Sequence, residues 1–167
     1  MSLDVLNAAS DAQFMEMIGG PLEGETWLAL RVAARRPFAD VPALFAAFER
    51  EVRAASEDER IALIRSHPDL GNKLAVGRPL SADSVKEQAS AGLDRLTGAE
   101  YAEFHLLNNE YRSRFGFPFV ICARENTKES ILEAFRARRE AERPREIDTA
   151  VAEVLKILRL RLTDKYG

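Results

Sequence analysis

The sequence predicts an all-α protein, a bundle of about seven or eight helices in a single domain. Apolar residues recur at the three- and four-residue spacing of helices along most of the chain. Helix-capping residues precede these stretches, and the period-two alternation of β-strands is almost absent. A length of 167 residues suits one domain, so we expect one domain over residues 1–167.

Five helix starts are indicated by capping residues. Four are capping boxes, in which a hydroxyl side chain and the side chain three residues later each satisfy a backbone N–H group. The four pairs are Ser10 with Gln13, Ser56 with Glu59, Ser84 with Glu87, and Thr97 with Glu100. Asp40 precedes Val41 and Pro42, which predicts a capped start with proline in the first turn.

Two further helices are expected in the last third of the chain. Apolar residues follow helical spacing in residues 131–135 and again in residues 147–162. Between them, residues 136–146 are rich in arginine and are interrupted by three glutamates. We expect a solvated turn region around Pro144 there.

Two segments do not fit a helix. Residues 66–79 form a loop rich in Gly and Pro, in which Pro68 favours an extended backbone at His67, at or just beyond the end of the preceding helix. The second segment, Phe-Gly-Phe-Pro-Phe-Val-Ile at residues 115–121, is apolar and too short for a helix. We expect a short extended segment whose backbone must pair with side chains, water or a ligand, because a helical protein offers no sheet.

Composition excludes several other classes of protein. The chain is 46% hydrophobic and 31% charged, which argues against intrinsic disorder. No apolar run approaches the roughly 20 residues of a membrane-spanning helix, and no signal peptide is recognisable. Cys122 is the single cysteine, and the net charge of −3 comes from interleaved charges of both signs. We therefore expect a cytoplasmic protein without membrane or nucleic-acid partners.

The C-terminal helix carries an arginine on its apolar face. At about 100° per residue, Arg161 falls within the arc that includes Val154 and Leu158, and the neighbouring cations fall outside it. A buried guanidinium needs an anionic partner or carbonyl oxygens. Arg161 would face a ligand, pair with a structural carboxylate, or reach solvent near the chain end, and spacing alone favours the last two.

A second group of polar residues shares one helix face. Ser84, Glu87 and Gln88 lie together at helical spacing, with the small Ala91 leaving room above them. This arrangement would suit the polar wall of a pocket. Spacing alone favours a capping box at Ser84 and Glu87, which needs no chemistry.

His67 is the candidate for proton transfer among the two histidines. The alternative is a helix-terminal histidine that interacts with the last carbonyl groups. We expect His105 to be structural and Asn108 to be a buried amide that satisfies a loop backbone. Cys122 fits a small buried hydrophobe better than a nucleophile, and two distant histidines give no metal motif.

Five motifs occur together in a characteristic order. They are His67 to Leu70, Ser84 to Leu93, Leu107 to Tyr111, Arg114 to Val120, and Leu160 to Leu162. With this order and spacing, the sequence resembles the OHCU decarboxylases, where OHCU is 2-oxo-4-hydroxy-4-carboxy-5-ureidoimidazoline. The resemblance runs from about Leu6 to the C-terminus, and the continuation Gly71-Asn72-Lys73 departs from the more frequent Ala-Gly-Lys.

The resemblance implies an all-α carboxy-lyase that is cofactor-independent, holds no metal and forms a homodimer. It implies a small-molecule ureide substrate, OHCU, which is converted to (S)-allantoin in the last step of urate oxidation in purine catabolism. By the same resemblance, His67 is the catalytic acid/base, Glu87 its catalytic partner and Arg161 the residue that faces the ligand. The implied ligand-contacting positions are Pro68, Ser84, Gln88, and the backbone of Phe119, Val120, Ile121, Cys122 and Ala123.

Two alternatives belong to other functional classes. The first is a helical interaction module without catalysis, in which Arg161 and Glu87 form structural ion pairs. The second is a helical enzyme that acts on a related ureide or hydantoin. Turnover of fresh OHCU would distinguish an OHCU decarboxylase from the non-catalytic module. A comparison of which ureide stabilises the protein against heat would distinguish it from an enzyme that acts on a related ureide.

Overall fold

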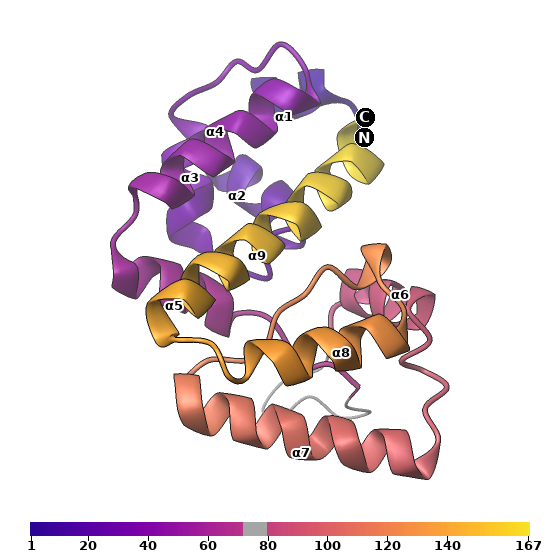
Figure 1. The fold of residues 1–167 in the computed structure, drawn as a ribbon. Coiled ribbons are helices and arrows are strands. Elements are labelled where there is room, and N and C mark those ends of the chain that lie inside the picture. Colours follow the sequence, from indigo (N-terminus) through magenta and orange to yellow (C-terminus); the bar gives the residue numbers. More distant parts are fainter. Residues whose placement is uncertain (72–79) are drawn as a thin grey trace. The chain divides into compact units, whose positions relative to one another are not determined.

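The computed structural model describes residues 1–71 and 80–167, and the regular secondary structure of these residues is entirely helical (Figure 1). The described residues contain nine α-helices and one 3₁₀ helix, η1, and no strand. The elements are α1 (Leu3–Ala8), α2 (Asp11–Gly19), α3 (Thr26–Ala33), α4 (Val41–Ala54), α5 (Glu57–Arg65), α6 (Ala82–Ser90), α7 (Gly98–Phe115), η1 (Ala123–Glu125), α8 (Lys128–Arg138) and α9 (Arg143–Tyr166). The all-α prediction is confirmed.

The helices α1 and α3 are the two that the sequence patterns do not reveal. α1 has six residues, fewer than two helical turns, so it carries no apolar period. α3 follows Glu25, whose side chain makes no capping hydrogen bond. Of the predicted loop over residues 66–79, residues 72–79 lie outside the described residues.

Four of the five predicted helix starts are confirmed. The hydroxyl or carboxylate groups of Ser10, Asp40, Ser56 and Thr97 each accept a hydrogen bond from the backbone N–H group three residues later. The capping box at Ser84 is wrong, because α6 begins three residues earlier. Ser81 caps it instead, and its hydroxyl accepts the backbone N–H of Ser84 at 3.1 Å.

The chain folds as two compact units, Met1–Arg60 with Leu155–Gly167, and Ile61–Val154. The expectation of one domain over residues 1–167 stays a prediction. In the described part of the chain, no helix has both the length and the apolar character needed to cross a bilayer.

In the first unit, α2 packs against α3, and α3 packs against α4 (Figure 1). Phe14, Leu28 and Phe48 come from these three helices and are fully buried in its core. The chain's single tryptophan, Trp27, lies in α3. Its indole N–H donates to Glu25 at 2.7 Å, so the ring is fixed by a polar contact as well as by packing.

In the second unit, α7 and α8 lie side by side (Figure 1). A cluster of aromatic rings joins them to residues 116–122, which form neither helix nor strand. The ring of Phe119 stacks on Phe135 of α8 at 3.8 Å between centroids and meets the edge of Tyr111 of α7 at 5.3 Å. The segment is thereby fixed by its side chains, without a sheet.

Candidate active site

His67 lies just beyond the end of α5, as predicted. The helix ends at Arg65, and the backbone N–H of His67 donates to the carbonyl group of Ile64 at 3.2 Å. The residue is 7% exposed, so its imidazole is largely withdrawn from bulk water. A shielded histidine at a helix end suits proton transfer to a bound molecule.

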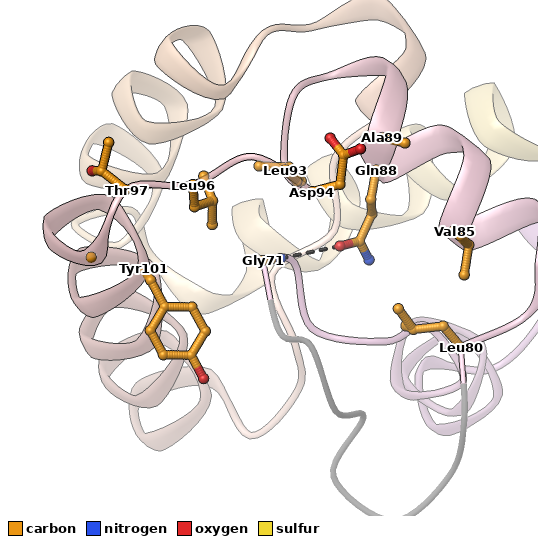
Figure 2. A pocket seen from close by; sticks show the side chains of 11 residues that line it. Gly71, Leu80, Val85, Gln88, Ala89, Leu93, Asp94, Leu96, Thr97 and Tyr101 are labelled. Carbon is orange, nitrogen blue, oxygen red and sulfur yellow. Dashed lines mark hydrogen bonds between the residues drawn. The ribbon is translucent and has the colours of Figure 1, made fainter.

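The turn that follows His67 is held by two buried carboxamides. Gln88 of α6 accepts the backbone N–H of Gly71 at 3.1 Å (Figure 2). It also donates to the carbonyl group of Asp69 at 3.3 Å. Asn108 of α7 donates to the carbonyl group of Leu70 at 2.8 Å. The prediction that Asn108 satisfies a loop backbone is therefore confirmed.

The polar face of α6 brings Glu87 close to the segment that ends in η1. Ser84 and Gln88 are buried and Glu87 is half-buried, and α6 packs against η1. Burial raises the pKa of the Cys122 thiol, and the nearby carboxylates of Glu125, Glu153 and Glu87 raise it further. A protonated, buried thiol agrees with the prediction that Cys122 is not a nucleophile.

The backbone of the 116–122 segment finds side-chain partners, as its lack of a sheet requires. Arg138 of α8 donates to the carbonyl group of Val120 at 2.7 Å, and Asn126 donates to that of Cys122 at 2.9 Å. The guanidinium of Arg138 also lies 4.2 Å from the centroid of the Phe119 ring. The backbone of two predicted ligand-contacting residues is thus held by side chains from α8 and from the C-cap of η1.

Arg138 and Glu146 form a buried ion pair, so the prediction of a solvated turn region over residues 136–146 is wrong for these two residues. Their side chains are 13% and 1% exposed, and the Nε of Arg138 lies 2.6 Å from the Glu146 carboxylate. The hydroxyl of Tyr111 donates to the same carboxylate at 2.5 Å. Burial and the adjacent Glu146 raise the pKa of Tyr111, so it remains a donor. These mutual partners allow the charges to be buried.

Arg161 belongs to the first unit and is 4% exposed. Its Nη1 donates to the Glu23 carboxylate at 2.8 Å and to the carbonyl group of Pro21 at 3.4 Å. Glu23 lies in a turn with a φ angle of 53°, in the left-handed region. The structure therefore shows the pairing with a structural carboxylate that helical spacing favours, and the contact of Arg161 with a ligand stays a prediction.

A hollow of about 680 Å³ lies in the second unit, and Figure 2 shows the side chains that line it. Its lining is mostly apolar and includes Leu80, Val85 and Tyr101. Gln88 contributes to the wall, whereas His67 and Glu87 are not among the lining residues. Of the three residues whose spacing suggests a polar pocket wall, Ser84, Glu87 and Gln88, the described lining of this hollow includes Gln88.

The OHCU decarboxylase family model matches residues 7–163. The chain belongs to the OHCU decarboxylase family. It is 36% identical over 164 residues to the 2-oxo-4-hydroxy-4-carboxy-5-ureidoimidazoline decarboxylase of Halalkalicoccus jeotgali, a match that covers 98% of this chain and 91% of that protein. It is 39% identical over 163 residues to the uric acid degradation bifunctional protein PucL of Bacillus subtilis. That match covers 98% of this chain and 32% of PucL, so the chain spans about a third of the bifunctional relative.

Solved structures of OHCU decarboxylase and of a related enzyme share this fold. A crystal structure of (S)-allantoin synthase superposes with a TM-score of 0.77 at 26% identity, covering 99% of this chain and 54% of that one. An OHCU decarboxylase crystallised in the presence of (S)-allantoin has a TM-score of 0.75 at 21% identity, covering 93% of this chain and 97% of that one. The helical fold expected from the resemblance is the family's fold.

Proposed function

We propose that this family member decarboxylates OHCU to (S)-allantoin, with His67 as general acid/base, Glu87 as its partner and Arg161 as substrate anchor. The match of the family model to residues 7–163, which include all three, carries the proposal. The chain is a carboxy-lyase of urate degradation, and its substrate is a small ureide. The division of roles among the three residues rests on the resemblance and on their burial.

The substrate supplies its own electron sink, so the proposal includes no cofactor. In OHCU the carboxylate is on C4, beside the imine carbon C5. When the C4–carboxylate bond breaks and CO₂ leaves, the electron pair forms a C4=C5 bond and the imine nitrogen takes up the charge. Decarboxylases that use a cofactor obtain the same electron sink from that cofactor.

Three proton transfers must then follow, and we assign those at the C4 hydroxyl and at C5 to His67. The former imine nitrogen takes up a proton, the C4 hydroxyl loses a proton as the carbonyl group forms, and C5 gains a proton on one face, which sets the S configuration. Histidine titrates near neutral pH and can serve both steps. The 7% exposure of His67 supports the proposal, because a shielded imidazole limits unselective protonation by bulk water.

Glu87 and Arg161 have the two remaining proposed roles. Half-buried Glu87 would orient His67 or accept a hydrogen bond from the substrate hydroxyl. Its negative charge would also destabilise the substrate carboxylate that leaves as CO₂. Arg161 would bind the substrate through charge-assisted hydrogen bonds, with Glu23 fixing its orientation. The backbone of residues 119–123 would bind the ureido and ring amides.

We also infer a homodimer that acts in the cytoplasm. Size-exclusion chromatography with light scattering would test the dimer, and cell fractionation would test the location.

Circular dichroism of freshly generated OHCU tests the function directly. OHCU decays on its own to racemic allantoin, so rapid appearance of the (S) signal reports enzymatic turnover. We expect that signal with the protein, unaffected by a chelator. Decay at the spontaneous rate to a racemate, with folded protein present, would contradict the proposal.

Variants test the roles of the residues. H67Q and E87A should each abolish most (S)-allantoin formation. H105Q is the matched control, because His105 is the only other histidine and is exposed on α7. If H67Q or E87A retained nearly the wild-type rate, the assignment of that residue would be wrong.

A further inference from the structure

The residues on either side of His67 lie along α7 in an antiparallel register. Three polar contacts and one close approach, that of Gly71 to Phe104, define it, and their partners on α7 and its C-cap are spaced four residues apart, on one face of the helix. From the end of α5 to the turn, the pairs are Arg65 with Gly116, Asp69 with Arg112, Leu70 with Asn108, and Gly71 with Phe104. His67 lies between the first and second contacts.

The backbone at Gly71, the last residue of this register, has little room to move. Gly71 has a φ angle of 73°, and a Cβ atom added there would lie 3.1 Å from Cγ of Phe104. On the opposite side, Gln88 accepts the N–H of Gly71, as Figure 2 shows. The turn therefore fits one position against α7, and the chain leaving His67 is constrained accordingly.

The contact between Asn108 and Leu70 is the best shielded of the three polar contacts. Asn108 is 4% exposed, and its amide donates to the Leu70 carbonyl group at 2.8 Å. The side chain of Arg112 is 51% exposed, so its ion pair with Asp69 is screened by solvent and holds the loop less firmly. A buried carbonyl group that loses its donor cannot recover water, so the turn must move to satisfy it.

We propose that Asn108 is a positioning residue for His67, acting through the turn of residues 69–71 without touching the substrate. The proposal rests on the proposed role of His67 in proton transfer. It also predicts that the face of α7 formed by Phe104, Asn108 and Arg112 affects the chemical step more than substrate binding. A displacement of about 1 Å at a catalytic group costs up to about 100-fold in rate.

The substitution N108D tests this proposal. It keeps the shape of the side chain and replaces the donating amide with an oxygen that repels the Leu70 carbonyl group. We expect kcat for OHCU to fall by about 10- to 100-fold with KM changed less than about twofold. N109D is the matched control, because Asn109 is the next residue on α7, is exposed, and contacts His105 rather than the turn.

Imidazole NMR signals give a readout that does not depend on activity. The chain has two histidines, so each spectrum contains two sets of signals, and H105Q assigns them. We expect N108D to shift the His67 signals and N109D to shift those of His105 alone. Unshifted His67 signals in a folded N108D protein would overturn the positioning role. Shifted signals in a protein whose wild type does not turn over OHCU would support positioning and contradict the proposed function.

A second variant keeps the test decisive if N108D does not fold. R112Q changes a half-exposed side chain and breaks its pair with Asp69, so the fold should tolerate it. We expect a smaller shift of the His67 signals and a decrease in kcat of about two- to fivefold, since exposed ion pairs are weak. Unchanged His67 signals and unchanged kcat in R112Q would then refute the proposal.

Discussion

Replacing Arg138 by methionine tests the buried ion pair that contacts the 116–122 segment. R138M keeps most of the side-chain length and removes the guanidinium, which donates to Glu146 at 2.6 Å and to the Val120 carbonyl group at 2.7 Å. The Glu146 side chain is 1% exposed, so water cannot replace the lost donor. The variant therefore leaves one buried charge without its counter-ion.

The expected loss is large for a single substitution. Removing one partner of a buried pair costs about 3–5 kcal/mol of unfolding free energy. The hydroxyl of Tyr111 still donates to Glu146, which favours the lower end of that range. The double variant R138M/E146Q removes both charges, so it should recover roughly 1–3 kcal/mol relative to R138M alone.

Urea unfolding followed by far-ultraviolet circular dichroism measures these differences. R136M is the matched control, because Arg136 lies on the same helix and pairs with Glu103 where the side chains are 52% and 35% exposed. It should cost no more than about 1 kcal/mol. If R138M were no more destabilised than R136M, or if the double variant recovered nothing, the buried pair would not stabilise the fold as argued.

Three further predictions follow from the charges and the thiol. E23Q removes the carboxylate partner of buried Arg161, so urea unfolding should show a loss of about 3 kcal/mol, and unchanged stability would contradict the pairing. Hydrogen bonds from the backbone N–H of Thr97 and from Lys128 lower the pKa of Glu100 below its usual 4.5. The stabilisation that the ionised carboxylate gives the fold is therefore present above pH 4.5 and is lost as the pH falls through the lowered pKa of the folded protein. The Tm of E100Q should therefore approach that of the wild type in acid, and a constant difference down to the lowest pH would be inconsistent with this. Burial raises the pKa of Cys122, so a thiol reagent at pH 8 should react much faster with unfolded than with native protein, and equal rates would contradict its burial.

The local parts of the fold are readable from the sequence because they depend on neighbouring residues. The caps at Ser10, Asp40 and Thr97 involve partners three residues away, and the position of His67 follows from Pro68. The start of α6 is ambiguous from neighbouring residues alone, because two serines could cap it. Ser84 and Glu87 match a capping box, yet Ser81 precedes them at the same spacing and caps the helix.

The candidate site was only partly predictable, because its partners are distant in the sequence. Glu23 lies 138 residues from Arg161, and no local pattern relates the two. Arg138 and Glu146 stand in a stretch whose composition looks solvated, and only the approach of Tyr111 and Val120 makes burial possible. Asn108 was predictable as a buried amide from its helical stripe, whereas its partner Leu70 required the fold.

The chain carries one natural reporter in each compact unit. Trp27 is its single tryptophan and belongs to the first unit, and Cys122 is its single cysteine and belongs to the second. Tryptophan emission and thiol accessibility can therefore follow the unfolding of each unit in one unmodified protein. Coincident denaturant midpoints would mean that both units unfold in one cooperative transition, as a single domain does. Separate midpoints would reveal a partly folded species and show which unit it retains.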